Sequence, residues 1–179
     1  MKPIYIENYC DDIYEHLLNL EWVSYRETRK EYFMANKEVT YTYGKGDFAK
    51  SYKSKPYTLP VLALQEKLNK DFKTNYNVMF SNLYDTEKSH LDWHCDNSPE
   101  MNQDHPICSV SFGSEREIYW KEKSYSGVIP DSNKQLLKHC SLFIMPSNFQ
   151  KNHLHKIAKA GKIQTKPRIS LTFRNYNGL

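Results

Sequence analysis

Two stretches in the first half of the chain carry apolar residues at the spacing of an amphipathic helix. In residues 11–20 (DDIYEHLLNL) they recur three and four positions apart behind two aspartates, which favour a helix N-terminus. In residues 60–72 (PVLALQEKLNKDF) a proline occupies the first turn, where its missing N–H would have had no partner in the helix. We therefore predict helices over both ranges. Residues 21–59, which lie between them, are basic and aromatic without a regular period and are predicted to be irregular.

The pattern changes after residue 75. Short runs rich in β-branched and aromatic residues follow one another, with polar loops and no helical stretch between them. Such a succession is typical of an all-β sandwich or barrel. The predicted strands are YNVMFSNLY (76–84), CSVSFG (108–113), EIYW (117–120), SLFIM (141–145) and RISLTFR (168–174). The expected fold class is α+β, mainly β, with a helical and irregular N-terminal third laid against a C-terminal β-sandwich.

Composition narrows the class of protein only moderately. The 179 residues fit one domain with a real core, and 25 basic against 21 acidic residues give a charge of +4, which permits a nucleic-acid partner without requiring one. No apolar run suits a signal peptide or a membrane span. Cys10, Cys95, Cys108 and Cys140 show no paired spacing, so free thiols in a reducing cytoplasmic compartment are expected, the nucleus also being compatible.

A histidine and an aspartate two residues apart, His94 and Asp96, form the first candidate for chemistry. In an extended segment, residues two apart point to the same side, so both could bind one metal ion. A later histidine, His153 or His155, would complete two imidazoles and one carboxylate, the set that leaves open positions in iron(II) oxygenases. Taken alone, the His-x-Asp pattern also fits ordinary surface residues.

The second candidate is the pair Arg168 and Arg174, whose even spacing places both guanidinium groups on one face of a strand. Ile169, Leu171 and Phe173 then face the other way. Two buried guanidinium groups need anions, and a dicarboxylate would pair with them through parallel hydrogen bonds. Solvated arginines on an exposed strand face are the alternative.

These features, in this order, resemble the AlkB family of Fe(II)/2-oxoglutarate-dependent dioxygenases. The family's motifs are matched by Asn82 and Tyr84 before His94 and Asp96, by PICSVSFG (106–113), by SLFIM (141–145) and by the closing RISLTFR (168–174). The resemblance covers roughly residues 40–176. It implies a single domain, with residues 1–59 as N-terminal helix and nucleotide-recognition lid and residues 60–179 as second helix and double-stranded β-helix (jelly-roll) catalytic core.

The resemblance also implies a ligand set. The metal ligands would be His94, Asp96 and His155, because the family's second histidine follows five residues after a position often held by glutamine, here Gln150. His153 would then pack beside the metal. The residues expected to hold 2-oxoglutarate are Asn82, Tyr84, Arg168, Ser170 and Arg174. Of these, Arg174 is expected to pair with the distal carboxylate, Arg168 to lie beside the active site, and Ser170 stands where relatives often have asparagine.

The substrate base is expected between Tyr43 and His94, since a base taken out of its stack needs an aromatic face. The residues predicted to contact the substrate are Tyr41, Tyr43, Lys45, Ser98, Glu100 and Arg116. Lysines of the same stretch, interleaved with aromatic residues, suit phosphates and stacking: Lys45, Lys50, Lys53 and Lys55. Ser98 stands where many relatives have an acid that contacts the exocyclic amine of the base, so Glu100 or Asn97 substitutes, or the preferred base differs.

The function implied by the resemblance is oxidative dealkylation of N-alkylated bases in DNA or RNA, such as 1-methyladenine and 3-methylcytosine. Fe(II), 2-oxoglutarate and O2 would be required, with release of formaldehyde, succinate and CO2, by a monomer. Two alternatives stay open: a hydroxylase of a protein or small molecule, and a non-catalytic nucleic-acid-binding module. The basic, aromatic residues 21–59 favour nucleic acid, and the intact ligand set argues against a pure binder.

Overall fold

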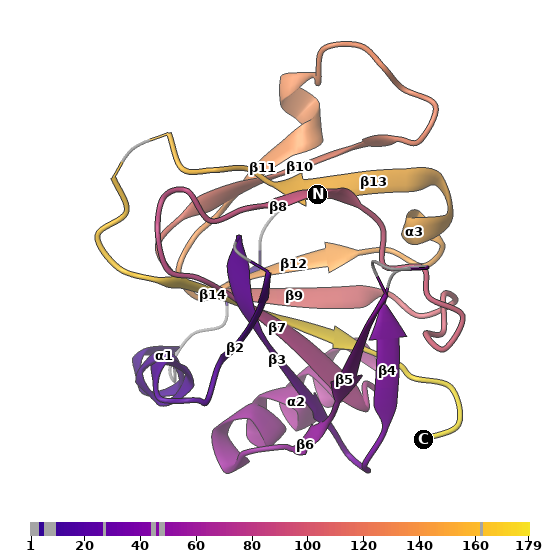
Figure 1. Ribbon diagram of the computed structural model, residues 1–179. Coiled ribbons are helices and arrows are strands. Elements are labelled where there is room, and N and C mark those ends of the chain that lie inside the picture. The colour runs from indigo at the N-terminus through magenta and orange to yellow at the C-terminus, as the bar shows by residue number, and fades with distance from the viewer. Residues whose placement is uncertain (1–3, 6–9, 27, 44–45, 47–48, 162) are drawn as a thin grey trace.

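A computed structural model describes residues 4–5, 10–26, 28–43, 46, 49–161 and 163–179 of the chain. Its strands form two facing layers with two helices against the outside of the larger one (Figure 1). The helices are α1 (Cys10–Leu18), α2 (Leu59–Phe72) and α3 (Phe149–Asn152), with a 3-10 turn, η2 (Asp131–Asn133). The strands are β1 (Ile4–Tyr5), β2 (Val23–Arg26), β3 (Arg29–Ala35), β4 (Thr40–Tyr43), β5 (Lys50–Lys53), β6 (Lys55–Pro56), β7 (Val78–Tyr84), β8 (Leu91–His94), β9 (Ile107–Gly113), β10 (Arg116–Glu122), β11 (Lys134–Leu137), β12 (Ser141–Met145), β13 (His153–Ile157) and β14 (Arg168–Arg174).

The strands from β7 onward alternate between the two layers. The larger sheet has the order β1-β12-β9-β14-β7-β3-β2, and the smaller sheet, above it in Figure 1, has the order β11-β10-β13-β8. Along the chain, β7, β9, β12 and β14 enter the larger sheet, while β8, β10, β11 and β13 enter the smaller one. This alternation between two mostly antiparallel sheets is a jelly roll. The prediction of a mainly β chain with a jelly-roll core is confirmed.

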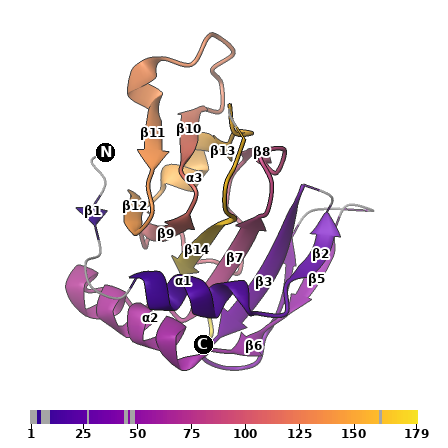
Figure 2. The ribbon, with the colours of Figure 1, turned by 90° about the vertical axis from the view of Figure 1, so that its left-hand side faces the viewer.

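Helices α1 and α2 lie side by side on the outer face of the larger sheet (Figure 2). Buried positions of α2 fall at helical spacing, and Leu64 and Leu68 pack with Leu17 of α1 into one apolar cluster with the outward side chains of the sheet. Both predicted helices are confirmed, with their ends shifted by at most two residues. None of the described helices has the length and apolar character needed to cross a bilayer.

Strand β14 shows how the larger sheet separates core from site. All seven of its residues are buried. Ile169, Leu171 and Phe173 belong to the apolar cluster under the helices, as their alternation predicts. The remaining side chains, all polar, face a cavity between the two sheets: Arg168, Ser170, Thr172 and Arg174. A strand buried on both faces is normally apolar on both, so this polar face marks a functional requirement.

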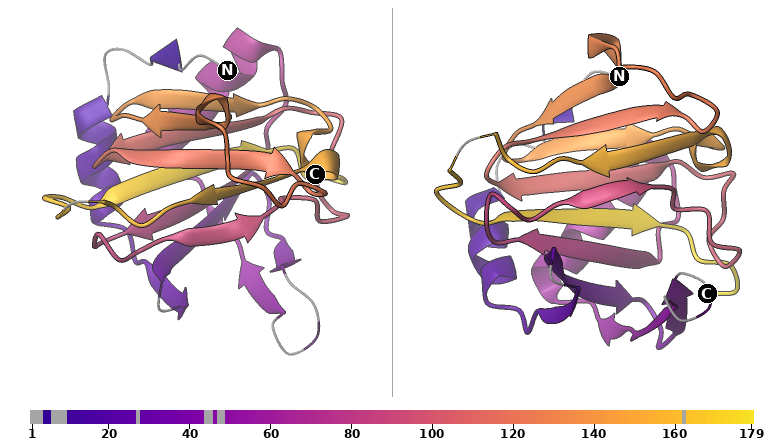
Figure 3. Two further views of the ribbon diagram at one scale, coloured as in Figure 1. Left: turned by 90° about the horizontal axis from the view of Figure 1, so that it is seen from above. Right: turned by 45° about the horizontal axis from the view of Figure 1, so that its top comes forward.

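The prediction that residues 21–59 are irregular is wrong. Strands β2 to β6 occupy this stretch; β3 pairs with β7, and β4 and β5 form a hairpin that projects to one side of the smaller sheet when seen from above (Figure 3). The simple alternation of a strand is hidden in β3, because Arg29 and Glu31 are buried yet polar and face the cavity. On the hairpin, Tyr41 and Tyr52 pack with Phe80 of β7.

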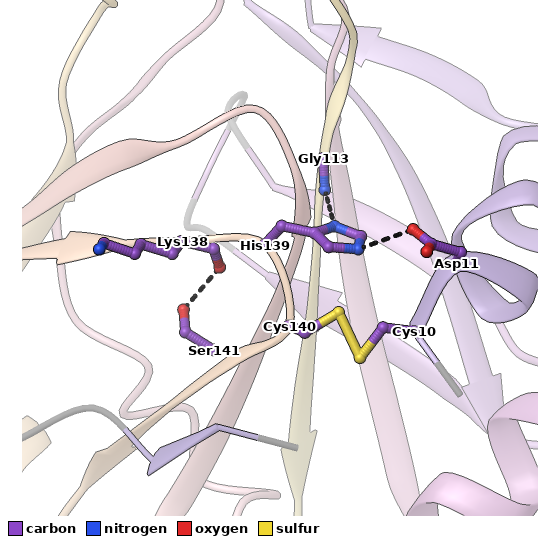
Figure 4. Close-up of a disulfide and its surroundings, with 7 residues drawn as sticks. All are labelled: Cys10, Asp11, Gly113, Lys138, His139, Cys140 and Ser141. Carbon is purple, nitrogen blue, oxygen red and sulfur yellow. Dashed lines mark hydrogen bonds and ion pairs between the residues drawn. A yellow bond between two sulfur atoms is a disulfide. The ribbon is translucent and has the colours of Figure 1, made fainter. Parts of the chain in front are cut away.

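The expectation of free thiols is wrong for two of the four cysteines. Cys10 at the start of α1 and Cys140 just before β12 form a disulfide with their Cα atoms 5.8 Å apart (Figure 4). Beside it, His139 Nε2 lies 3.1 Å from the carboxylate of Asp11. The two cysteines are 130 residues apart and are brought together only by the fold, so their pairing could not be predicted from local spacing. Cys95 and Cys108 are free.

Replacing Leu171 by alanine should destabilise the fold by about 2–5 kcal/mol, because the side chain is fully buried between β14 and the helices and its loss leaves a cavity. Urea denaturation of both proteins would measure the difference. Leu59→Ala is the matched control, since Leu59 is 82% exposed and its truncation should change stability by about 0.5 kcal/mol or less. Equal effects of the two substitutions would contradict the assignment of the core.

Candidate active site

A cavity with an empty volume of about 670 Å³, its open mouth included, lies between the two sheets. Strands of both sheets and the β4–β5 hairpin contribute its lining. One group of lining residues consists of imidazoles, two carboxylates and guanidinium groups, and another is aromatic. The cavity therefore combines groups that hold ions with groups that stack on flat rings.

Three side chains with metal-binding atoms converge in this cavity. His94 ends β8, His155 lies directly opposite it on β13, and Asp96 follows β8 by two residues. Asp96 lies beside both imidazoles, with Oδ1 3.9 Å from His94 Nε2 and Oδ2 3.8 Å from His155 Nε2. The ligand atoms of all three lie within 4.8 Å of one another, so small side-chain rotations let them share one ion. Two imidazoles and one carboxylate suit iron(II) with open coordination positions.

Of the two late histidines, His155 joins this group and His153 does not. The ring of His153 stacks on Phe149 at 4.6 Å with an interplanar angle of 9°. On His94, Nδ1 lies 2.8 Å from the carbonyl oxygen of Asp92, which can only accept, so Nδ1 carries the proton and Nε2 is left for a metal.

The protonation states of the three candidate ligands also favour metal binding. Burial would raise the pKa of Asp96, but Arg174 and the two imidazoles outweigh it and hold that pKa at about 2. Burial lowers the pKa of His155 to about 3, and the neighbouring His94 adds to the effect. Burial likewise lowers the pKa of His94. Near neutral pH the carboxylate is charged and both imidazoles are neutral, which is the state that metal binding requires.

Two further residues hold Asp96 in place. Arg174 NH2 donates to Asp96 Oδ2 at 2.7 Å, with both side chains buried. The backbone N–H of Asp96 donates to the side-chain oxygen of Gln150 at 3.0 Å. In the sequence, Gln150 only helped to locate His155 five residues later. Its contact with Asp96 could not be predicted, because the two residues are 54 positions apart.

The two arginines of β14 have different environments. Arg174 is engaged with Asp96 at the metal site rather than with a separate anion pocket. Arg168 is fully buried, and its NH2 group donates to Ser111 Oγ at 2.9 Å while Nε and NH1 have no partner among the described residues. A buried guanidinium with unpaired N–H groups is costly unless an anion completes it. Arg168 is therefore the better fit for a ligand carboxylate.

The hydroxyl and amide groups predicted to accompany the arginines also line the cavity. Asn82 and Tyr84 come from β7, and Ser170 lies opposite Asn82 on β14. The guanidinium carbon of Arg168 lies 5.0 Å from the centre of the Tyr84 ring. A carboxylate placed beside Arg168 would thus find further donors around it.

Some of the predicted substrate-binding residues line the cavity and others lie outside its lining. Tyr41 and Tyr43 line the cavity, with ring centres 6.4 Å apart, and Ser98 shares a hydrogen bond of 2.8 Å with the Tyr41 hydroxyl. Burial, with a contribution from nearby Asp96, raises the pKa of Tyr43 to about 12. Glu100 is half-buried outside the cavity lining.

One other predicted contact, Arg116, is described by the structure, and another, Lys45, is not. Arg116 does not line the cavity; its guanidinium donates to the backbone carbonyls of Thr86, Ser89 and Ala158 and to the side chain of Gln164. Through these hydrogen bonds Arg116 connects loops of the protein, which differs from the expected contact with the substrate. Lys45 lies outside the described residues.

Comparison with known proteins defines the class to which this fold and cavity belong. Residues 13–174 match the family described as the 2OG-Fe(II) oxygenase superfamily. The chain belongs to this superfamily, whose members use Fe(II), 2-oxoglutarate and O2. The His-Asp-His group is a candidate set of iron ligands for such a protein, and Arg168 offers unpaired donors for a carboxylate.

Several relatives carry AlkB names. Alpha-ketoglutarate-dependent dioxygenase alkB homolog 3 of Mus musculus is 30% identical over 76% of this chain and 48% of its own length, and that of Bos taurus is 28% identical over 92% and 61%. DNA oxidative demethylase ALKBH2 of Bos taurus is 26% identical over 82% of this chain and 52% of its own. The chain thus spans about half to three-fifths of these relatives. The solved structure of OsALKBH1 has the same fold, with a TM-score of 0.61, 14% identity and 98% of each chain covered.

Replacing Asp96 by alanine should abolish metal binding, because it removes the carboxylate that lies within 4 Å of both imidazoles. Calorimetric titration with Mn(II) should show a loss beyond the roughly 10- to 100-fold caused when only an outer partner of a ligand is removed. His155→Ala should behave alike, whereas His105→Ala, outside the cavity lining, should bind as the unaltered protein does. Unchanged affinity in Asp96→Ala would remove that residue from the metal site.

Proposed function

We propose that this chain is a monomeric Fe(II)/2-oxoglutarate-dependent dioxygenase that removes alkyl groups from N-alkylated bases of DNA or RNA, such as 1-methyladenine and 3-methylcytosine. One observation carries the proposal: the metal-binding group, the arginine with unpaired N–H groups (Arg168) and a set of aromatic rings line the same cavity. The names of the relatives, among them a DNA oxidative demethylase, support a nucleic-acid substrate.

In this proposal His94, Asp96 and His155 hold the iron, and Arg168 pairs with the distal carboxylate of 2-oxoglutarate. Asn82 supports the same ligand. Its Oδ1 accepts from Arg29 Nε at 2.7 Å, and because arginine can only donate, this contact fixes the orientation of the amide. The Asn82 amide nitrogen is then the atom that can donate to the ligand. When bound, the iron and 2-oxoglutarate supply, with O2, the oxidation of an N-methyl group to a hydroxymethyl group that leaves as formaldehyde.

The protein's contribution is to orient the base and exclude water. Tyr43 is half-buried in the cavity beside Tyr41, and we propose that the alkylated base stacks between Tyr43 and the His94 side. A stacked ring in this position would place its alkylated edge toward the metal ligands. The aromatic wall, which also includes Tyr52 and Phe80, keeps the cavity dry on that side.

The lysines around the hairpin are proposed to contact phosphates. Lys53 Nζ lies 3.1 Å from Glu38, and Lys55 Nζ lies 2.8 Å from Glu21, so acidic neighbours hold both in the free protein. Exposed pairs of this kind contribute about 1 kcal/mol at most and can open when a phosphate competes. Binding of nucleic acid should consequently weaken as salt is raised.

The test of this function is incubation of oligonucleotides carrying single defined methylated bases with the protein, Fe(II), ascorbate and 2-oxoglutarate, followed by mass spectrometry. The expected result is a loss of 14 mass units from the methylated oligonucleotide, the mass of one CH2 group, with one succinate formed per repaired base. Succinate formation without any repaired oligonucleotide would direct the search to another substrate.

Arg168→Met should raise the 2-oxoglutarate concentration needed for half-maximal succinate release by roughly 10- to 150-fold, the loss expected when hydrogen bonds to a charged group are removed. The substitution keeps an unbranched side chain of moderate length in the buried position. Arg174→Met is the matched comparison, and because Arg174 contacts Asp96 its main effect should fall on metal binding. If Arg174→Met mainly raised the 2-oxoglutarate requirement and Arg168→Met mainly weakened metal binding, Arg174 would be the residue that pairs with the distal carboxylate.

Tyr43→Ala should impair repair of methylated oligonucleotides by roughly 10-fold or more while leaving substrate-free succinate release unchanged, because loss of one stacking ring costs about 1–3 kcal/mol per base. Tyr125→Ala, a change of a tyrosine outside the cavity lining, serves as control. Equal loss of both activities in Tyr43→Ala would indicate a structural role for the ring.

A further inference from the structure

A second buried cluster of charged and polar groups lies on the cavity wall formed by β3 and the hairpin. Glu31 is 1% exposed, and both of its carboxylate oxygens are held by donors from the protein. Arg29 NH2 donates to Oε1 at 2.6 Å, and the Tyr52 hydroxyl donates to Oε2 at 3.0 Å. All three residues line the cavity. None of them belongs to the metal-binding group.

The strands set the place of Glu31 within the cavity. Arg29, Glu31 and Phe33 alternate on one face of β3, and Glu31 pairs across the sheet with Asn82 of β7. Phe33 belongs to the aromatic cluster of the hairpin, whereas Arg29 contacts Asn82. Glu31 therefore stands at the boundary between the aromatic wall, where a base would stack, and the part of the cavity that contains Asn82.

Glu31 retains capacity to bind a ligand. A carboxylate offers about four acceptor sites on its two oxygens, and Arg29 and Tyr52 use two of them. The other carboxylate that lines the cavity, Asp96, is occupied with Arg174 and the two imidazoles. Ser98 shares its hydroxyl with Tyr41. Within the described lining, Glu31 is thus the carboxylate that remains for a substrate.

We propose that Glu31 is the residue that determines base specificity, by accepting a hydrogen bond from the exocyclic amine of the base stacked on the aromatic wall. This inference rests on the proposed function and deepens it. An amine beside the alkylated ring nitrogen donates a hydrogen bond to the carboxylate, so a base that carries this amine binds favourably. A carbonyl in the same position presents lone pairs to an acceptor-only group and leaves both unpaired in a buried site, which is unfavourable.

Arg29 and Tyr52 make this selection sharper because they fix the direction of the carboxylate from two sides. A buried acceptor that is already oriented loses little freedom when the base arrives. The arrangement selects 1-methyladenine and 3-methylcytosine, which carry an amine beside the alkylated nitrogen, over 1-methylhypoxanthine and 3-methyluracil, which carry a carbonyl in the same place.

A purely structural role for Glu31 makes a different prediction. If Glu31 only balanced the charge of Arg29, and through it the orientation of Asn82, its loss would alter 2-oxoglutarate use and would slow all bases alike. A specificity role changes the ratio between bases. That ratio is also independent of the fraction of folded protein, because unfolded protein lowers both rates equally.

The experiment compares Glu31→Gln with the unaltered protein on two matched pairs of oligonucleotides: 1-methyladenine against 1-methylhypoxanthine, and 3-methylcytosine against 3-methyluracil. Within each pair the methyl position is the same and the neighbouring amine is replaced by a carbonyl. We expect the unaltered protein to prefer the amine-bearing base in kcat/KM by roughly 10-fold or more, and Glu31→Gln to reduce this preference by roughly 10- to 100-fold, since its amide can donate to a carbonyl. Glu38→Gln, which removes an exposed carboxylate, is the matched control and should keep the preference.

A second measurement does not depend on turnover. Fluorescence anisotropy of the same oligonucleotides with metal-free protein should show the preference in Kd and its loss in Glu31→Gln. An unchanged ratio in Glu31→Gln, in binding and in turnover, would overturn the assignment, as would an unaltered protein that repairs both members of each pair equally. Failure to repair any of the four bases would instead overturn the proposed function.

Discussion

The carboxylate of Asp96 and its compensation by neighbouring charges are the interaction on which the site depends. A buried carboxylate costs several kcal/mol unless it is paired, and here Arg174 supplies the pairing charge beside the two neutral imidazoles. The imidazoles belong to β8 and β13 of the smaller sheet, whereas Arg174 ends β14 of the larger one. The contact therefore joins the two layers at the point where chemistry is proposed, and a metal ion bound there would strengthen the same junction.

Polar and apolar groups share the space between the two sheets. On β14 and β3, alternate residues that face the cavity are charged or hydroxylic. Apolar packing lies on both sides of the larger sheet: α1 and α2 cover one cluster on its outer face, and a second cluster, which includes Ile118, Phe143 and Ile157, joins the two sheets.

The sequence predicted those parts of the structure that local pattern determines. Helices α1 and α2 and the strands with apolar runs follow from periodicity, and SLFIM and RISLTFR coincide with β12 and β14. The convergence of His94 and Asp96 followed from their spacing, but the choice of His155 needed the resemblance to a family. Spacing also placed Arg168 and Arg174 on one face, yet it could not tell which of them meets Asp96. That depends on where β8 lies relative to β14.

Strand β3 and Glu31 show why the rest could not be predicted. Polar residues at alternate positions are typical of a solvated surface, and only the fold reveals that Arg29 and Glu31 are buried together beneath the hairpin. The Cys10–Cys140 pair is a similar case, because its partners are brought together by α1 and the turn before β12.

The place of β14 in the larger sheet has a consequence for how the chain reaches its native state. This strand, near the end of the described residues, lies between β9 and β7 and pairs with both along almost its whole length. Until residues 168–174 are available, the two halves of the sheet have no shared neighbour, so the middle of the layer is completed last. Such dependence on pairing between distant segments is associated with slow folding. During synthesis, β7 and β9 would each present an open edge to other chains, and a chaperone or rapid completion of the polypeptide would be needed to protect them.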